Sequence, residues 1–302
     1  MTIEPTDCLT RRRALVAMAK PGLAAFTLPL LGSLALSQEA NAQKVGELRP
    51  VSIYWLKYEH SQQELIGDLL NTERGDPQRE AEIAHQHWYS HETRRRWGAW
   101  GPAPRTYTPL EGLASRSLQW KRERVIATAA RFIGYGYQHH HIPDWNPPAN
   151  WPWKETCVGH NGKGFDCSNF TSFVYNQGFG IHMSSGIGRQ SRVEAAFERG
   201  GQAVHLHTIE FSDDYRERQK TLHTGDLLYI RGREEGPITH VVIWIGSVGR
   251  APHDIPLILD SHGAGVVDEA GQHIPCGVHL RPFRESSWYN RCASHAHRVF
   301  HG

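Results

Sequence analysis

The sequence predicts an α+β fold in which helices come first and an antiparallel sheet follows. Apolar residues recur at helical spacing over 125–133 and again over 165–178. Further along, the segments 226–230, 240–245 and 257–262 have the length and composition of strands. Helices followed by consecutive strands are typical of an antiparallel sheet with packed helices, and differ from the strand–helix alternation of a doubly wound fold.

The composition indicates a folded chain with no surface suited to nucleic acid. The 302 residues include 33 Lys and Arg against 31 Asp and Glu, so the net charge is only +2. This balance gives no general attraction to nucleic acid or to an anionic membrane. Hydrophobic residues make up 39% of the chain, which is enough for a sizeable core. Five cysteines are too few for a disulfide scaffold of this length.

Residues 1–42 have the three parts of an export signal. A basic segment at 10–13 precedes an apolar stretch at 22–36, and small residues follow at 40–42. The adjacent arginines resemble a twin-arginine signal. An uncleaved anchor helix is the alternative, but the apolar stretch is shorter than the roughly 20 residues that a spanning helix needs. We therefore expect a mature chain that begins near Gln43, is periplasmic or secreted, and has no stable membrane insertion.

The next segment, 43–116, predicts an N-terminal extension of unknown role. It contains a short strand candidate at 51–55 and a partly helical stretch at 62–91, and it carries no recognisable motif. We expect this extension to pack on the domain that follows it, which spans 117–302.

Within 117–302, the first predicted helix ends at Gly134 and the second ends at Gly178. The segment 138–164 between them is rich in Pro, Trp and Gly, which predicts a long irregular loop of the kind that is often functional. Short strands are also predicted at 278–280 and 297–300.

Cys167 is the candidate nucleophile. Asp166 is a good N-cap residue, which places Cys167 in the first turn of the second helix. Unpaired backbone N–H groups and the helix dipole favour negative charge there, and a neighbouring imidazolium favours the thiolate further. A buried, inert cysteine is the alternative, and the helix position alone does not decide between the two.

The histidines favour the catalytic interpretation. His240 opens an apolar strand at its edge. If 257–262 folds back antiparallel so that Ile245 pairs with Leu257, then His240 lies opposite His262. A cysteine nucleophile requires a base and a polar group that orients the base. We expect His240 to be the base and His262 to orient it. Asp260 lies on the same strand face and is the reserve candidate.

Disulfide connectivity is open at this stage. Cys276 and Cys292 have the option of pairing with each other, and Cys157 is a candidate for a regulatory disulfide with Cys167.

A metal site is not predicted, although the chain has 20 histidines. The run 139–141 and the pair His205 and His207 have no cysteine or carboxylate at the usual ligand spacing. We expect no metal and no cofactor.

The motifs resemble, in order, those of the NlpC family of bacterial cell-wall cysteine peptidases. The resemblance covers about 117–301 and is carried by 129–134 with Tyr137, by Gly164-Phe165-Asp166-Cys167-Ser168, by 224–228, by 240–246, and by the tail with Gly277, Val278, Trp288, Arg291, Arg298 and Val299. It implies a papain-like fold with Cys167 as nucleophile, His240 as base and His262 as the third polar residue. It also implies that Tyr137, beside the oxyanion position, contacts substrate together with Asp166 and Ser168.

This chain departs from the family pattern around the cleft. Asn169 replaces a common glycine, His140 and His141 replace a usual glycine pair, and the loop to Gly164 is longer. These differences concern the choice of substrate more than the chemistry.

The resemblance implies hydrolysis of amide bonds in peptidoglycan stem peptides, in particular between D-glutamate and a diamino acid, with peptidoglycan or muropeptides as the partner. Two other function classes stay open. One is a thiol acyltransferase or amidase that acts on another amide, and the other is a noncatalytic cell-wall-binding protein. The sequence predicts no oligomeric state.

Overall fold

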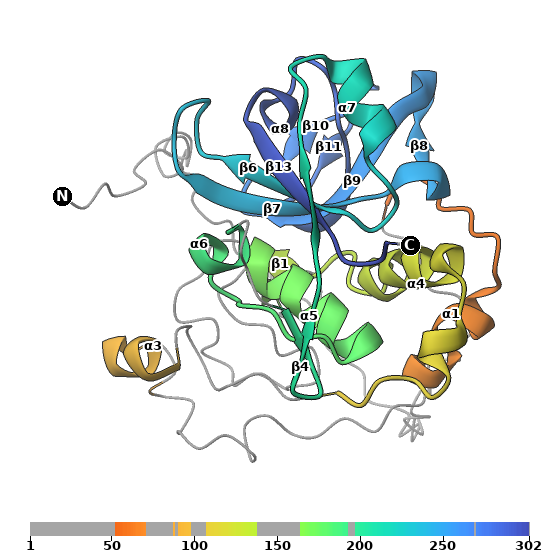
Figure 1. The fold of residues 1–302 in the computed structure, drawn as a ribbon. Coiled ribbons are helices and arrows are strands. Elements are labelled where there is room, and N and C mark those ends of the chain that lie inside the picture. Colours follow the sequence, from red (N-terminus) through yellow and green to blue (C-terminus); the bar gives the residue numbers. More distant parts are fainter. Residues whose placement is uncertain are drawn as a thin grey trace, which may run out of the picture. The chain divides into compact units, whose positions relative to one another are not determined.

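Helices precede strands along the chain, as expected (Figure 1). The computed structural model describes residues 52–70, 87, 90–97, 107–137, 164–192, 197–268 and 270–301. All of these residues fall within one unit, Arg49–Gly302. The predicted export signal at 1–42 and most of the loop at 138–164 lie outside the described residues.

Helices α1, α4 and α5 lie on one side of the main sheet, and α7 and α8 lie on the other (Figure 1). In none of the described segments is a helix long and apolar enough to cross a membrane. The helices are α1 (Gln62–Leu70), α3 (His91–Trp97), α4 (Leu118–Ala130), α5 (Cys167–Phe179), α6 (Ile187–Gln190), α7 (Tyr215–Thr221) and α8 (Trp288–Arg291), with short 3-10 turns η2 (Leu113–Ser115), η3 (Gly246–Val248) and η4 (Pro252–Asp254).

The main sheet is antiparallel, in the order β12-β9-β7-β6-β13-β5, with β8 paired to β9. Its strands are β5 (His207–Glu210), β6 (Leu227–Arg231), β7 (Ile238–Trp244), β8 (Arg250–Ala251), β9 (Ile255–His262), β12 (Gly277–Pro282) and β13 (Ala293–Arg298). Three two-stranded pairs accompany it: β1 (Gly136–Tyr137) with β2 (Gly164–Phe165), β3 (Phe197–Arg199) with β4 (Gln202–Val204), and β10 (Val266–Val267) with β11 (His273–Ile274). The predicted α+β class is confirmed.

The register between β7 and β9 is the one predicted from the sequence. Ile243 pairs with Leu259 and Trp244 pairs with Ile258, and the Ile245 N–H donates to Leu257 O at 3.1 Å. Extended back along both strands, this register puts His240 level with His262.

Both faces of the sheet are buried, because side chains alternate along each strand. One face packs on α4 and α5 through residues that include Val241, Ile243 and Leu259. The other face forms a second apolar cluster with α7 and α8, and it contains Val242, Trp244 and Ile258. His240 shares this second face by alternation.

Helix α5 continues past the predicted stop at Gly178. A β-carbon on Gly178 would lie 3.3 Å from Thr128 Oγ1 on α4, so this glycine permits a close helix–helix approach inside α5. The helix ends instead at Gly180, which has φ 63°. A β-carbon added to Gly180 would lie only 2.8 Å from the carbonyl oxygen of Tyr107. Only glycine fits this left-handed, crowded cap without strain.

The described part of the N-terminal extension packs on the domain. Helix α1 buries Leu65, Ile66 and Leu69 in the same core cluster as α4 and α5. The strand predicted at 51–55 is wrong over the described residues 52–55, which form bends and irregular backbone. This segment is held by loop contacts, such as the bond from Lys57 N to Val248 O at 2.7 Å.

Candidate active site

Cys167 is the first residue of α5, as the cap residue predicts. The Asp166 carboxylate accepts the Asn169 backbone N–H at 2.8 Å and the Asn169 side-chain amide at 2.7 Å, which fixes the start of the helix. Because Asp166 takes the Asn169 N–H, the N–H groups of Cys167 and Ser168 are the ones in the first turn that can bind a negatively charged group. Cys167 is a free thiol and is 5% exposed.

His240 lies beside this thiol. The sulfur of Cys167 is 3.9 Å from the carbonyl oxygen of Thr239, and its side chain hydrogen-bonds with His240. On the other side of the ring, His240 Nε2 is 2.7 Å from Asp260 Oδ2. Because Asp260 takes Nε2, the remaining nitrogen, Nδ1, is the one that can exchange a proton with Cys167.

Asp260, not His262, orients His240, and this corrects the assignment made from the sequence. The Nδ1 atom of His262 is 2.9 Å from the carbonyl oxygen of Ala264, so this ring is engaged with its own turn. Its contact with His240 is edge-on, with ring centroids 5.1 Å apart. The register does put His262 level with His240. Asp260, two positions along β9 on the same face, is the diagonal neighbour and is also within reach across the sheet.

The Asp260 carboxylate is held by two further buried side chains that the sequence analysis missed. Arg281 Nε donates to Oδ1 at 2.7 Å, and the Tyr289 hydroxyl donates to Oδ2 at 2.9 Å. Asp260 and Arg281 are both 0% exposed. The signal in the sequence was Arg281, which directly follows the strand candidate at 278–280. An arginine that continues a buried strand needs an ionic partner.

The electrostatics favour the protonated form of His240. Burial by itself lowers the pKa of His240, but the negative charges of Cys167 and Asp260 outweigh it and raise that pKa to about 10. Burial would raise the pKa of Asp260, but the Arg281 guanidinium and His240 hold it well below its usual range. This direction favours a protonated His240 at neutral pH, between the Cys167 sulfur and the ionised Asp260 carboxylate.

Tyr137 is brought to the same site. It pairs with Phe165 in the β1–β2 ladder. Burial raises the pKa of its hydroxyl, and the negative charges of Cys167 and Asp166 raise it further. The phenol thus stays neutral beside the Cys167 sulfur.

Asp166 and Ser168 have structural contacts. Asp166 caps α5, and the Ser168 hydroxyl donates to Ser185 O at 2.6 Å, which ties the helix start to the segment before α6. Contact of either residue with substrate stays a prediction.

The cysteines do not pair as the sequence allowed. Cys292 is a free, buried thiol in the second apolar cluster, under α8. Cys276 is disulfide-bonded, so pairing between Cys276 and Cys292 is wrong, and the partner of Cys276 lies outside the described residues. Because Cys167 is free, it takes no part in a bridge with Cys157 in this structure.

Over the described ranges, no three His, Cys, Asp or Glu side chains are grouped so as to hold a metal ion. His205 and His207 are within these ranges, and the run at 139–141 is outside them.

Comparison with known proteins adds a family match. Residues 156–294, a little under half of the chain and less than the 117–301 of the resemblance, match the NlpC/P60 family model. This range contains Cys167, His240 and Asp260. No curated protein matches the chain.

Among solved structures, the chain is similar to an NlpC/P60 family protein from Bacillus cereus ATCC 10987. The identity is 21%, the TM-score is 0.34, and the similarity covers 59% of this chain. It spans 40% of the length of that protein. The match thus shows that residues 156–294 are similar to the NlpC/P60 family, and the α+β fold described above is consistent with the papain-like NlpC fold that the resemblance implies.

Proposed function

We propose that this protein is a cysteine peptidase that hydrolyses amide bonds in the peptides of bacterial peptidoglycan. The observation that carries the proposal is the buried triad of Cys167, His240 and Asp260. The Cys167 thiol hydrogen-bonds with the His240 imidazole, and the Asp260 carboxylate binds the ring nitrogen Nε2. The match to the NlpC/P60 family supports the substrate class.

In the proposed reaction the Cys167 thiolate attacks the amide carbon. Negative charge then develops on the carbonyl oxygen, and the backbone N–H groups of Cys167 and Ser168 at the start of α5 are placed to donate hydrogen bonds to it, with the Tyr137 hydroxyl beside them. The His240 imidazolium gives its proton to the leaving amine, and a thioester forms. Neutral His240 next removes a proton from water, which attacks the thioester and restores the thiol site.

Two finer proposals rest on the sequence, the first on the NlpC resemblance and the second on the three-part segment at 1–42. The cleaved bond is the one between D-glutamate and a diamino acid, and residues 1–42 direct export to the periplasm or the exterior. Both are open to direct tests: cleavage of defined stem peptides for the first, and the location of a reporter fused after residue 42 for the second.

The experiment for the proposed activity is muropeptide digestion by purified protein, followed by mass spectrometry. We expect Cys167→Ala to lower turnover by at least about 1,000-fold, because no other group can form the acyl intermediate. Ser172→Ala is the matched control, since Ser172 is also buried on α5 but bonds to Met183 O instead of the catalytic groups.

Three outcomes would contradict the proposal. Undiminished turnover in Cys167→Ala would remove the nucleophile. Products that carry a transferred acyl group in place of added water would indicate an acyltransferase. Binding to sacculi without release of fragments by the wild type would indicate a noncatalytic wall-binding protein.

A further inference from the structure

The turn that leads into strand β12 carries a disulfide and lies against the groups that orient His240. It consists of Pro275, Cys276 and Gly277, and Cys276 is disulfide-bonded. Pro275 is exposed, Cys276 is half-buried and Gly277 is buried. We call these three residues the Cys276 turn. The proposed reaction makes no use of Cys276, so its disulfide is a feature that the chemistry leaves unexplained.

Arg281 binds the Cys276 turn on one side and Asp260 on the other. Its Nε donates to Asp260 Oδ1 at 2.7 Å, and its Nη2 donates to Pro275 O at 2.9 Å and to Gly277 O at 3.2 Å. Within the described part of the chain, Nη1 has no hydrogen-bond partner. Two of the three acceptors that hold the guanidinium therefore belong to the residues on either side of Cys276.

The position of the guanidinium fixes the direction of the Asp260 carboxylate. Oδ1 binds Arg281, and Oδ2 is 2.7 Å from His240 Nε2. A carboxylate is planar and rigid, so its two oxygens move together. A displacement of the Cys276 turn therefore moves Arg281, and Arg281 turns Asp260 away from the His240 ring. A misplacement of about 1 Å around a catalytic group costs on the order of 100-fold in rate.

Close packing restrains the turn on its Gly277 side. Gly277 has φ 93°, and a β-carbon added there would overlap the carbonyl oxygen of Tyr135 and lie 3.0 Å from Gly136 Cα. Only glycine allows the turn to meet strand β1 this closely without strain. The next residue, Val278, donates its N–H to Tyr135 O at 2.8 Å. At Cys276 itself the restraint is the covalent bridge.

We propose that the Cys276 disulfide is a positioning element for the proposed reaction. It holds the two carbonyl groups of the Cys276 turn in place for Arg281, and Arg281 in turn holds the Asp260 carboxylate against His240. The bridge itself touches neither the substrate nor the reacting atoms. It should therefore affect the turnover number more than substrate binding. This inference rests on the proposed peptidase function and adds an intact bridge to the requirements of the active site.

Reduction of the bridge tests the proposal. Dithiothreitol gives it two electrons and two protons, so that the bridge becomes two thiols while the reagent closes to its own cyclic disulfide. We expect kcat for muropeptide hydrolysis to fall by about tenfold or more, with KM changed less than about twofold. Cys276→Ala should show the same values without the reagent and should not respond to it.

Mass spectrometry reports whether the bridge is open, and circular dichroism reports whether the protein is folded. The reduced wild type replaces Cys276→Ala if that variant does not fold. An unchanged kcat in folded protein with an open bridge would overturn the proposal. A rise in KM at constant kcat would overturn it as well.

A double-mutant cycle tests the route through Arg281. Arg281→Lys keeps the positive charge beside Asp260 but loses the planar donors that reach the Cys276 turn. In this background, Cys276→Ala should lower kcat by less than about twofold, because the two changes remove the same link. Losses that multiply independently would show that the disulfide acts elsewhere, and the proposal would fail.

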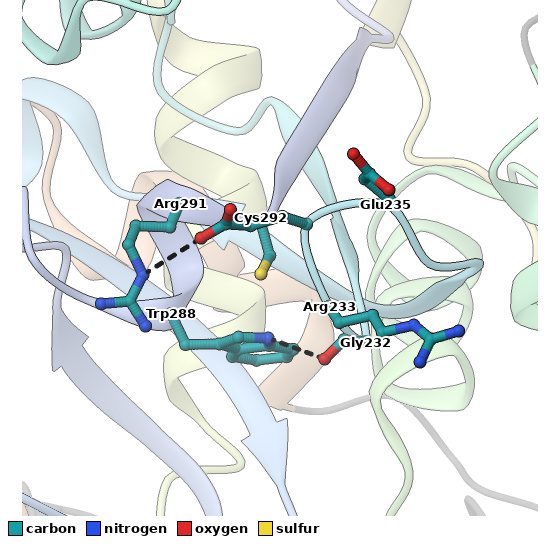
Figure 2. A pocket seen from close by; sticks show the side chains of 7 residues that line it. Gly232, Arg233, Glu235, Trp288, Arg291 and Cys292 are labelled. Carbon is teal, nitrogen blue, oxygen red and sulfur yellow. Dashed lines mark hydrogen bonds and ion pairs between the residues drawn. The ribbon is translucent and has the colours of Figure 1, made fainter.

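Cys292→Ala is the matched control for the reductant. Cys292 is the other noncatalytic cysteine of the described residues, and Figure 2 shows its sulfur directed toward the Trp288 indole. Its surroundings belong to α8 and to the turn that joins β6 to β7. This variant should keep the full response to dithiothreitol. A lost response would assign the effect to Cys292 and overturn the role of Cys276.

Alkylation of Cys167 separates the positioning role from the hydrolytic activity. Iodoacetamide reacts with thiolates, and a protonated His240 favours the thiolate of Cys167. At neutral pH we expect Cys276→Ala to slow alkylation of Cys167 by about threefold or more and to leave that of Cys292 unchanged, with both rates followed by mass spectrometry of their peptides.

If this result is obtained and the wild type shows no turnover, the positioning role stands and only the hydrolytic proposal fails. Equal rates for Cys167 in wild type and Cys276→Ala would refute the positioning role. Faster alkylation of both Cys167 and Cys292 would also refute it, because that result indicates general loosening of the fold.

Discussion

The Asp260 carboxylate influences the protonation of His240, the proposed base. It is fully buried, and it accepts hydrogen bonds from His240, Arg281 and Tyr289. A buried carboxylate without an ionic partner would take up a proton, but the Arg281 guanidinium keeps it ionised. The charge that Arg281 stabilises on Asp260 in turn stabilises the imidazolium of His240.

Replacement of Asp260 tests this arrangement. We expect Asp260→Asn to lower kcat by about 100-fold to 10,000-fold, because an amide neither fixes the His240 tautomer nor stabilises its positive charge. Asp260 contributes to the raised pKa of His240, about 10, so its removal lowers that pKa. The imidazolium is lost as pH rises through this pKa, and the alkaline limb of kcat/KM should therefore move to lower pH.

Two milder variants separate orientation from general damage. Tyr289→Phe removes one hydrogen bond to Asp260 and leaves its charge, so kcat should fall by only a few-fold, with the alkaline limb almost unmoved. His262→Gln changes a ring that bonds to Ala264, and we expect a decrease of less than about tenfold. A larger loss in His262→Gln than in Asp260→Asn would restore His262 as the orienting residue.

At the residue scale, local rules predicted that Cys167 and His240 lie together, but not that Asp260 is the group that contacts the far side of the His240 ring. The cap at Asp166 and the position of His240 in the first half of an apolar strand are properties of short segments. Asp260 and His262 differ by two positions on one face, so alternation and register do not distinguish them. The choice depends on Arg281 and Tyr289, which come from other elements and neutralise the carboxylate only in the folded chain.

At the element scale, apolar strands were predictable and polar ones were not. Strands β6, β7 and β9 are buried on both faces and have continuous apolar sequences. The edge strand β5 and the β3–β4 hairpin were missed, because their exposed positions carry polar residues that give no clear pattern. Helix α7 was missed as well; six of its seven side chains are not buried, and it begins at the Asp214 cap.

Strand β13 contains a buried pair of histidines that should make stability depend on pH. His297 is 0% exposed and packs against Tyr229 and His295, with ring centroids 4.8 and 5.1 Å away. Burial, and to a smaller extent the positive charge of the neighbouring His295, together lower the pKa of His297 to about 4. The unfolded chain, with a pKa near 6.5, therefore binds a proton more readily than the folded chain between these two values.

The contribution of His297 to the free energy of unfolding should therefore be fully present above about pH 6.5. It should decrease, by up to about 3 kcal/mol, as pH falls to about 4. Urea denaturation at several pH values measures this slope. His297→Gln should flatten the slope, whereas His301→Gln, at an exposed site near the C-terminus, should not change it. Equal slopes for the His297→Gln variant and the wild type would contradict the assignment.

At the scale of the whole molecule, the N-terminal extension is part of the core of the domain. Helix α1 packs on α4, and its Asp68 carboxylate accepts two bonds of 2.7 Å from Arg124 of α4. Arg124 is fully buried and also donates to Gly178 O on α5 at 2.9 Å. One guanidinium thus joins α1, α4 and α5. The sequence suggested packing here, but it did not reveal the ion pair, because Asp68 and Arg124 lie 56 positions apart.

Asp68→Asn should destabilise the protein by about 2 to 3 kcal/mol. The substitution leaves the Arg124 guanidinium buried without a counter-charge, a loss that costs about 3 to 5 kcal/mol for fully buried pairs and less here because the Asp68 side chain is 30% exposed. The free energy of unfolding in urea measures the effect. Glu217→Gln breaks an exposed ion pair with Lys220 and should cost less than about 0.5 kcal/mol. Cys167 begins α5, which Arg124 joins to α4 and α1. If Asp68→Asn and Glu217→Gln lower the free energy of unfolding by the same small amount, the ion pair from α1 is not needed to hold α5 in place.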